Sequence, residues 1–189
     1  MNANFTTAIN TEKQQPLLTW DQVILVDEHD KVIGTEEKQK AHVDGKLHRA
    51  FSVFLFNSKG ELLLQRRAAH KYHSPNLWTN TCCSHPQPNR TLETDAHARL
   101  IDEMGIDCTL HKAFEFIYHA QFENGLTEYE YDHVFFGEFE GDPLPNPEEV
   151  GEWRWVTLNT IANEIQATPE LYTVWFQECF SKVVKVRKQ

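Results

Sequence analysis

The segment Trp78–Pro86 combines residue types and a spacing that could do chemistry. Cys83 lies two residues before His85, and Pro86 stops an ordinary helix from continuing across the segment. Alternate residues of an extended segment point to the same side, so we expect the thiol and the imidazole to face one pocket. This would place a nucleophilic or acid/base thiol beside a metal ligand. The pattern alone also fits a buried cysteine pair with a surface histidine, so the rest of the chain must decide.

A second segment, Thr127–Asp132, alternates acidic and aromatic residues. With the two-residue period of a strand, Glu128, Glu130 and Asp132 share one face. Neighbouring carboxylates repel each other unless a cation or a proton joins them. A solvated outer face is the alternative, but the apolar residues 134–136 that follow are typical of a core strand. Carboxylates that run into a core strand favour a metal site.

Two histidines flank the turn signal Asp44-Gly45, so the turn can bring both imidazoles together. The second of them also begins an apolar strand, where a solvated histidine is not expected. The candidate metal ligands are His42, His48, His85, Glu128 and Glu130. Mixed imidazole and carboxylate ligands suit Mn²⁺, Zn²⁺ or, less well, Mg²⁺. A structural zinc knuckle is the alternative, but the chain has no Cys-x₂-Cys pair.

The elements that must position these residues follow from periodicity and turn signals. We expect strands at 21–27, 48–57, 61–66, 113–122, 126–139 and 152–157, helices at 94–104, 158–167 and 170–186, and a loop at 38–46. Gly105 stands where a helix C-cap belongs, and Leu171 falls on the apolar face of the last helix. The order of elements predicts a single-domain α/β (α+β) fold with a mixed sheet between helices.

Length and composition exclude several classes of protein. The chain has 189 residues, of which 40% are apolar and 24% charged, as in one ordinary globular domain. We expect residues 1–19 to form a flexible polar leader and residues 20–189 to form the domain. No apolar run approaches the about 18 residues that span a bilayer, and no secretory signal is evident. We therefore expect no membrane partner.

Charge and cysteine content indicate which partners and which cellular compartment to expect. The formal net charge of −10 argues against a nucleic-acid surface, and a negatively charged substrate would need local cations or a metal. The four cysteines do not form a disulfide framework, because adjacent residues such as Cys82 and Cys83 rarely bridge. We expect a cytoplasmic monomer.

The segment Arg99–Ile106 resembles the tail of the Nudix box, whose acidic residues bind a metal–diphosphate substrate. Arg99, Ser84 and Arg90 stand where that box has Glu, Gly and Glu, which argues against a competent Nudix pyrophosphatase. Glu103 is retained and could hold a Mg²⁺ against a diphosphate. Since a carboxylate in the last turn of a helix opposes the helix dipole, we expect Glu103 to serve a cation rather than the fold.

Cations for a diphosphate follow the strand that begins at Glu61. The run Gln65–Lys71 contains two arginines and a lysine, and Lys38 and Arg99 are further candidates. Arginine binds phosphate oxygens with two-point geometry, and lysine adds a point charge. Such a run usually forms a solvated face, but its position at a strand end near the Cys-x-His segment favours substrate binding.

Taken together, the chain from about Asp21 to the last helix resembles the type 1 isopentenyl-diphosphate delta-isomerases, which have a Nudix-like fold. The most specific motif is Thr-Asn-x-Cys-Cys-Ser-His-Pro at 79–86, supported by Leu47–Ser52, Gln65–Ala68 and Glu128–Glu130. The resemblance implies an enzyme of isoprenoid biosynthesis that interconverts isopentenyl and dimethylallyl diphosphate through a tertiary carbocation. Its partner would be a prenyl diphosphate.

The resemblance also implies roles for individual residues. Cys83 and Glu130 would be the catalytic pair, and the five candidate ligands above would bind Mn²⁺, Zn²⁺ or Mg²⁺. Glu103 would hold a second, substrate-borne Mg²⁺, and neither flavin nor nicotinamide is implied. The implied substrate contacts are Lys38, Arg67, Lys71 and Arg99 for the diphosphate, with Tyr118 and Trp175 for the hydrocarbon.

Two other functions fit parts of this pattern. A Nudix-type hydrolase of nucleoside or prenyl diphosphates would use the acidic helix but has no use for Cys83. A metal-stabilised binding protein needs neither the thiol nor the basic strand end. The order of proton transfer between Cys83 and Glu130 stays open at this stage.

Overall fold

The computed structural model describes residues 20–71, 73–122 and 124–187, so the expected leader at 1–19 lies outside the described residues. Its strands are β1 (Gln22–Val26), β2 (Val32–Glu37), β3 (His48–Phe56), β4 (Glu61–Arg67), β5 (Trp78–Thr79), β6 (Cys82–Ser84), β7 (Leu110–Gln121), β8 (Thr127–Glu138) and β9 (Val150–Thr157). Its helices are α1 (Lys38–Asp44), α2 (Leu92–Met104), α3 (Leu158–Ala167) and α4 (Val174–Arg187), with a 3₁₀ turn at Pro169–Leu171.

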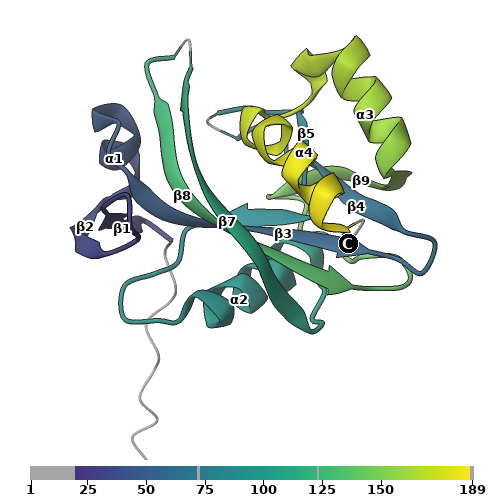
Figure 1. Ribbon diagram of the computed structural model, residues 1–189, viewed down its shortest axis with the longest axis horizontal. Helices are drawn as coiled ribbons and strands as arrows, with labels where there is room; N and C mark the ends of the chain where they lie inside the picture. Colours follow the sequence, from purple (N-terminus) through teal and green to yellow (C-terminus); the bar gives the residue numbers. More distant parts are fainter. Residues whose placement is uncertain (1–19, 72, 123, 188–189) are drawn as a thin grey trace, which may run out of the picture.

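Strand β3 organises the sheet. It pairs with β8 in parallel over its whole length and with β6 antiparallel, and it also contacts β1 and β4. The hairpin β7–β8 extends the sheet on one side, and β4 carries β9 and β5 on the other. The sheet is therefore mixed, as the order of elements predicted (Figure 1).

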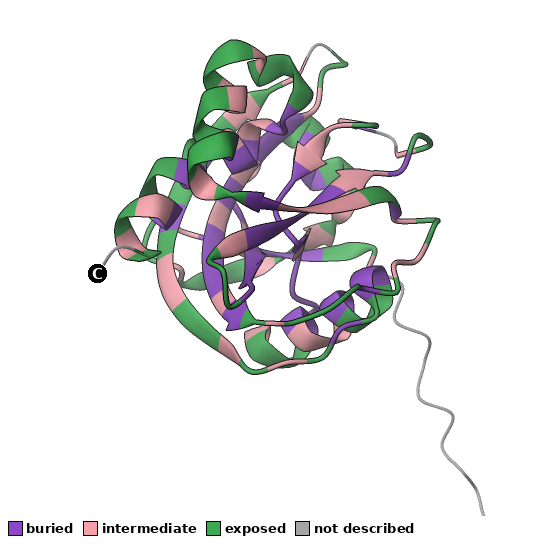
Figure 2. Cartoon of the chain, turned by 90° about the vertical axis from the view of Figure 1, so that its right-hand side faces the viewer, coloured by how far each residue is buried: buried purple, intermediate pink, exposed green. Residues whose placement is uncertain are grey.

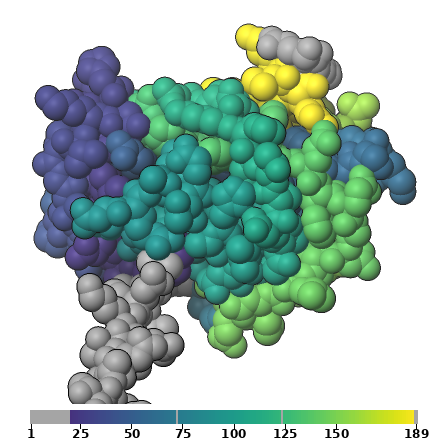
Figure 3. All heavy atoms as spheres, turned by 90° about the horizontal axis from the view of Figure 1, so that it is seen from below, coloured from purple at the N-terminus to yellow at the C-terminus, as the bar shows by residue number. Residues whose placement is uncertain are grey.

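Helices cover both faces of the sheet because β3 is apolar on both sides. Phe51, Val53 and Leu55 pack with the α2 residues in one core, whereas Phe54 and Phe56 pack with α4 in the other. In Figure 1, α2 lies below the sheet and α3 and α4 lie above it. Buried residues concentrate in the strands between these layers, and the atoms of the α2 region occupy the middle of the face seen from below (Figures 2 and 3).

Most of the expected elements are confirmed, and their bounds shift by a few residues. Two expectations were wrong. The segment expected as a loop at 38–46 contains α1, because Glu37 accepts hydrogen bonds from the backbone N–H groups of Gln39 (2.9 Å) and Lys40 (2.8 Å). Gly45 then ends the helix in the left-handed region at φ 62°. A seven-residue helix with a glutamate cap lacks the usual sequence signals.

The last helix also begins later than expected. The chain turns at Pro169–Leu171, and α4 starts only at Val174. Leu171 is therefore not on the buried face of α4 and is about half exposed. None of the helices in the described part of the chain is long and apolar enough to cross a membrane.

Gly105 offers a test of the packing that holds α2. It adopts φ 66°, as its predicted C-cap role requires, and an added Cβ would lie 2.6 Å from the carbonyl oxygen of Leu144. Gly60 has a similar φ of 75° but nothing within 4 Å of an added Cβ. Gly60→Ala should cost about 1–2 kcal/mol through its backbone conformation. Gly105→Ala should cost about 1–3 kcal/mol more, because of the clash.

Denaturant unfolding of both variants measures this difference. Equal losses of unfolding free energy would show that the contact with Leu144 adjusts without cost.

Candidate active site

The carboxylates of β8 lie on one buried face of the strand, as the alternation predicted. Glu128, Glu130 and Asp132 are each less than one-tenth exposed. The first two point toward the histidines of α1 and β3, whereas Asp132 accepts a hydrogen bond from Ser52 Oγ at 2.8 Å. Only the first two carboxylates thus belong to the histidine cluster.

The backbone fixes how His42 and His48 present their rings. The Nδ1 atom of His42 lies 2.6 Å from the carbonyl oxygen of Lys38, and that of His48 lies 2.8 Å from the carbonyl oxygen of Lys46. An Nδ1–H that donates to a carbonyl leaves Nε2 with a lone pair, which is the form that binds a metal. The two ring centroids lie 4.8 Å apart. The short helix α1 and its Gly45 cap produce this approach.

His85 joins the cluster from the position directly after β6. Its Nε2 atom lies 2.8 Å from Glu130 Oε1 and 3.2 Å from His48 Nε2. Burial lowers the pKa of His85 well below its usual range, so the ring is neutral at physiological pH. A neutral imidazole is the form required of a metal ligand.

The five residues offer one ligand atom each, and these atoms all lie within 4.8 Å of one another. The members of the cluster are His42, His48, His85, Glu128 and Glu130. His42 Nε2 and Glu128 Oε2 are 3.0 Å apart and buried, yet neither has a hydrogen bond of acceptable geometry. Converging nitrogen and oxygen atoms without hydrogen-bond partners fit a divalent cation between them.

The two adjacent cysteines point to opposite faces of the sheet, as expected. Cys82 is fully buried in the core against α2, and Cys83 lies on the α4 side and lines a cavity. The same cavity is lined by His85, so the thiol and the imidazole do share one pocket. Burial raises the pKa of the Cys83 thiol far above neutrality, so the sulfur carries its proton.

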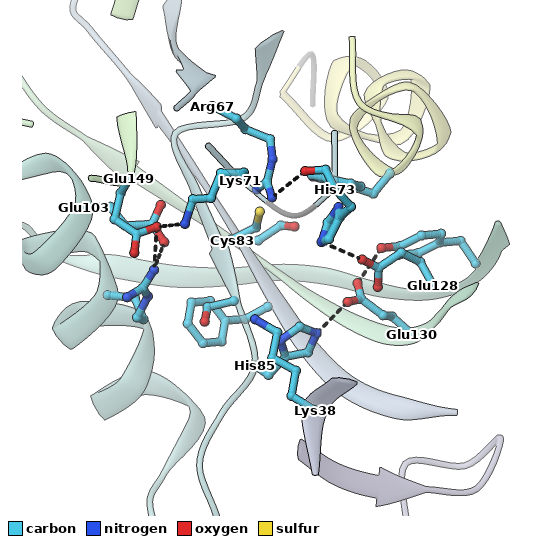
Figure 4. A pocket seen from close by; sticks show the side chains of 16 residues that line it. Lys38, Arg67, Lys71, His73, Cys83, His85, Glu103, Glu128, Glu130 and Glu149 are labelled. Atoms are coloured by element: carbon cyan, nitrogen blue, oxygen red, sulfur yellow. Dashed lines mark hydrogen bonds and ion pairs between the residues drawn. The ribbon is translucent and has the colours of Figure 1, made fainter. Parts of the chain in front are cut away.

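Glu130 lies across this cavity from the thiol (Figure 4). Tyr118 from β7 donates a hydrogen bond to Glu130 Oε2 at 2.5 Å. Burial alone would raise the pKa of Glu130, but the nearby His48 ring and the hydrogen bond from Tyr118 lower it overall. The cavity therefore holds a protonated thiol and an ionised carboxylate.

The structure brings all the predicted site residues together. His42 and His48 lie in the buried cluster behind the cavity. Lining the cavity itself are Lys38, Arg67, Lys71, Cys83, His85, Arg99, Glu103, Tyr118, Glu128, Glu130 and Trp175. Tyr118 and Trp175 are both buried, and Trp175 comes from the first turn of α4.

The structure contradicts the expectation that Glu103 gains nothing from the fold. Its carboxylate forms an ion pair with Arg99 on the same helix and accepts a hydrogen bond from Gln65 Nε2 at 2.9 Å. Arg99 supplies the positive charge that offsets the unfavourable helix dipole at this position. Both residues still face the cavity.

Two of the cavity residues that carry a titratable side chain, Glu149 and His73, were missed from sequence. Glu149 forms ion pairs with Lys71 and Arg99, but the Glu148-Glu149 pair after a Pro/Gly loop has the pattern of a solvated surface. His73 places Nε2 3.4 Å from Glu128 Oε1, and its ring lies against Trp175 with 5.7 Å between centroids. The sequence offers no periodicity around these loop positions that could have identified them.

Known structures of similar shape identify the fold. The DR0079 protein of Deinococcus radiodurans matches with a TM-score of 0.72 at 20% identity, over 85% of this chain and 98% of that one. The MutT protein of Methanosarcina mazei Go1 matches with a TM-score of 0.62 at 20% identity, over 76% and 96% of the two chains. At these identities the likeness concerns the fold alone.

Sequence relatives are much closer. Residues 46–176 match the NUDIX domain family. Isopentenyl-diphosphate Delta-isomerase 2 of Aromatoleum aromaticum is 52% identical over 167 residues, which cover 88% of each chain. Isopentenyl-diphosphate Delta-isomerase 2 of Photorhabdus laumondii is 53% identical over 156 residues, which cover 82% of this chain and 88% of the relative. The chain therefore belongs to the isopentenyl-diphosphate Delta-isomerase family of NUDIX-domain proteins.

Proposed function

We propose that this enzyme interconverts isopentenyl diphosphate and dimethylallyl diphosphate. The observation that carries the proposal is one cavity that Cys83 of β6 and Glu130 of β8 both line, with a group of cations at one end. Relatives at about half identity bear the name of this activity. An unactivated alkene is a very weak base, so its isomerisation needs a placed acid, a placed base and exclusion of water.

The lining of the cavity supports one orientation of the substrate. Arg67, Lys71 and Arg99 would receive the diphosphate, together with Lys38 at the start of α1. The hydrocarbon would then lie toward Trp175, between the thiol and the carboxylate. The π-face of a tryptophan stabilises a desolvated cation by about 1–2 kcal/mol, which suits the tertiary carbocation formed at C3.

The protonation states suggest roles for the catalytic pair. Cys83 carries a proton and would deliver it to C4 of isopentenyl diphosphate. Glu130, ionised and hydrogen-bonded to Tyr118, would accept the proton that leaves C2. The pair exchanges roles in the reverse direction, as microscopic reversibility requires. Proton return between turnovers has a path through the Tyr118 hydroxyl or water.

A divalent metal belongs to this site, because the buried cluster holds two carboxylates that need a counter-ion. We propose that His42, His48, His85, Glu128 and Glu130 bind Mn²⁺, Zn²⁺ or Mg²⁺, and that Glu103 holds a second Mg²⁺ carried by the diphosphate. A bound divalent ion would supply positive charge that fixes Glu130 and increases the acidity of its protonated form.

The first prediction separates isomerase from hydrolase. Incubation with isopentenyl diphosphate should yield dimethylallyl diphosphate and no phosphate, because Arg99 replaces a metal-binding glutamate of the hydrolase motif and forms an ion pair with Glu103. Product analysis by NMR together with a phosphate assay decides the matter. Release of phosphate or pyrophosphate without dimethylallyl diphosphate would identify a hydrolase.

The second prediction concerns the two thiols. Cys83→Ala should lower kcat by at least about 10²-fold with the fold intact, because the alkene loses its acid. Cys82→Ala should retain activity and lose about 1–2 kcal/mol of unfolding free energy, because it leaves a cavity beside α2. Kinetics and denaturation of both variants measure these effects. Equal losses of activity in two well-folded variants would mean that the wrong thiol is assigned.

The third prediction concerns the metal. Exhaustive chelation should abolish activity and lower the melting temperature, because two buried carboxylates lose their counter-ion. His42→Ala should act in the same way, whereas His111→Ala, an exposed histidine of β7, should leave metal content unchanged. Elemental analysis of each variant gives the readout. Full activity in chelated, metal-free protein contradicts the proposal.

A further inference from the structure

Glu149 lies between the cations expected to bind the diphosphate. It sits in the loop before β9, where its backbone N–H donates to the carbonyl oxygen of Asn146 at 3.0 Å. Its carboxylate forms an ion pair with Lys71 and lies 3.3 Å from Arg99 Nη2 (Figure 4). The side chain is only 20% exposed and lines the cavity. Burial would raise the pKa of Glu149, but Lys71 and Arg99 lower it overall, so the group is ionised.

Two cavity-lining carboxylates therefore share Nη2 of the Arg99 guanidinium, while its Nη1 binds Asp102 at 2.6 Å. Its Nη2 atom forms an ion pair with Glu103 and lies 3.3 Å from Glu149 Oε2. In the substrate-free protein, internal ion pairs neutralise these buried charges. A diphosphate that binds Lys71 and Arg99 competes with Glu103 and Glu149 for both cations. The two carboxylates would then face phosphate oxygens of the same sign across a poorly screened site.

Magnesium removes this conflict when it arrives on the diphosphate. Lys71 and Arg99 no longer fully compensate Glu103 and Glu149 once they also bind the phosphates. A divalent ion next to the phosphates offsets this remaining negative charge. A metal-free diphosphate brings no positive charge, so its oxygens are repelled by both carboxylates. The carboxylates thus oppose the metal-free form more strongly than the magnesium complex.

We propose that Glu149 is a specificity-determining residue that makes the site prefer Mg²⁺-complexed diphosphate over the metal-free form. Glu103, the proposed ligand of the substrate-borne Mg²⁺, would favour the complex by coordination, and Glu149 adds repulsion toward the metal-free form. This inference rests on the proposed diphosphate substrate, and it adds a role for a residue outside the proposed catalytic and metal-binding sets.

The test uses inorganic pyrophosphate as the probe. The full chain is loaded with metal at the histidine cluster and freed of unbound ion, and pyrophosphate binding is measured by calorimetry with and without Mg²⁺. Wild-type protein should prefer the magnesium complex. Glu149→Gln should bind metal-free pyrophosphate about tenfold more tightly, because one buried negative charge is removed, and its magnesium preference should fall accordingly.

The matched control is Glu148→Gln. Glu148 is the adjacent residue, its side chain is 81% exposed, and its carboxylate lies 3.4 Å from His70 Nε2. It should behave as wild type. Glu149→Asp keeps the charge and should retain the magnesium preference, and Glu149→Ala supplies a second neutral variant if the glutamine variant folds poorly.

Metal-free binding by folded neutral variants that is as weak as wild type, or weaker, would overturn the inference. Glu149 would then only hold Lys71 and Arg99 in position. Pyrophosphate binding is read without turnover, so this result is independent of whether dimethylallyl diphosphate is formed. If the enzyme isomerises its substrate but Glu149→Gln keeps the wild-type magnesium preference, this inference alone is wrong. If no variant binds pyrophosphate, the proposed diphosphate site itself is wrong.

Discussion

The architecture depends on a cluster of two carboxylates and three imidazoles buried where β3 meets β8 and β6. Buried carboxylates this close repel each other unless a cation compensates them, so the chain must supply both the ligands and their orientation. Parallel pairing sets His48 opposite Glu130, and antiparallel pairing with β6 brings His85 alongside. The helix α1 adds His42, and its Gly45 cap turns the chain at once into β3. Four elements thus converge on this buried site and together supply the ligands for a compensating cation.

The sheet separates structural from chemical tasks. Alternation along β6 sends Cys82 into the core with α2 and Cys83 into the cavity on the other face. The same alternation along β8 sends Glu128 and Glu130 to the histidines while Tyr131 takes the opposite side. Neighbouring residues of similar chemistry therefore serve different purposes. A one-residue slip in the register of either strand would exchange them.

The far end of the cavity shows how charge is arranged in this NUDIX domain. An arginine occupies a position that is acidic in the Nudix motif and forms ion pairs with Glu103 and Glu149. Helix α2 therefore presents both a guanidinium and the Glu103 carboxylate to the cavity. Charge at this end is thus balanced inside the protein before any substrate arrives, and a ligand must compete with those internal pairs.

The sequence by itself determined six of the nine strands of the described residues, the long helices, the pairing of Cys83 with His85 and the membership of the histidine–glutamate cluster. Those features follow from local periodicity and from motifs with specific spacing, which need no knowledge of distant contacts. Only the tertiary structure decided α1, the late start of α4, the compensation of Glu103 by Arg99, and the presence of Glu149 and His73 in the cavity. A glutamate cap, a loop carboxylate and a loop histidine carry no periodic signal. Their roles arise because folding brings them against charges far away in the chain, where burial makes each electrostatic contact strong.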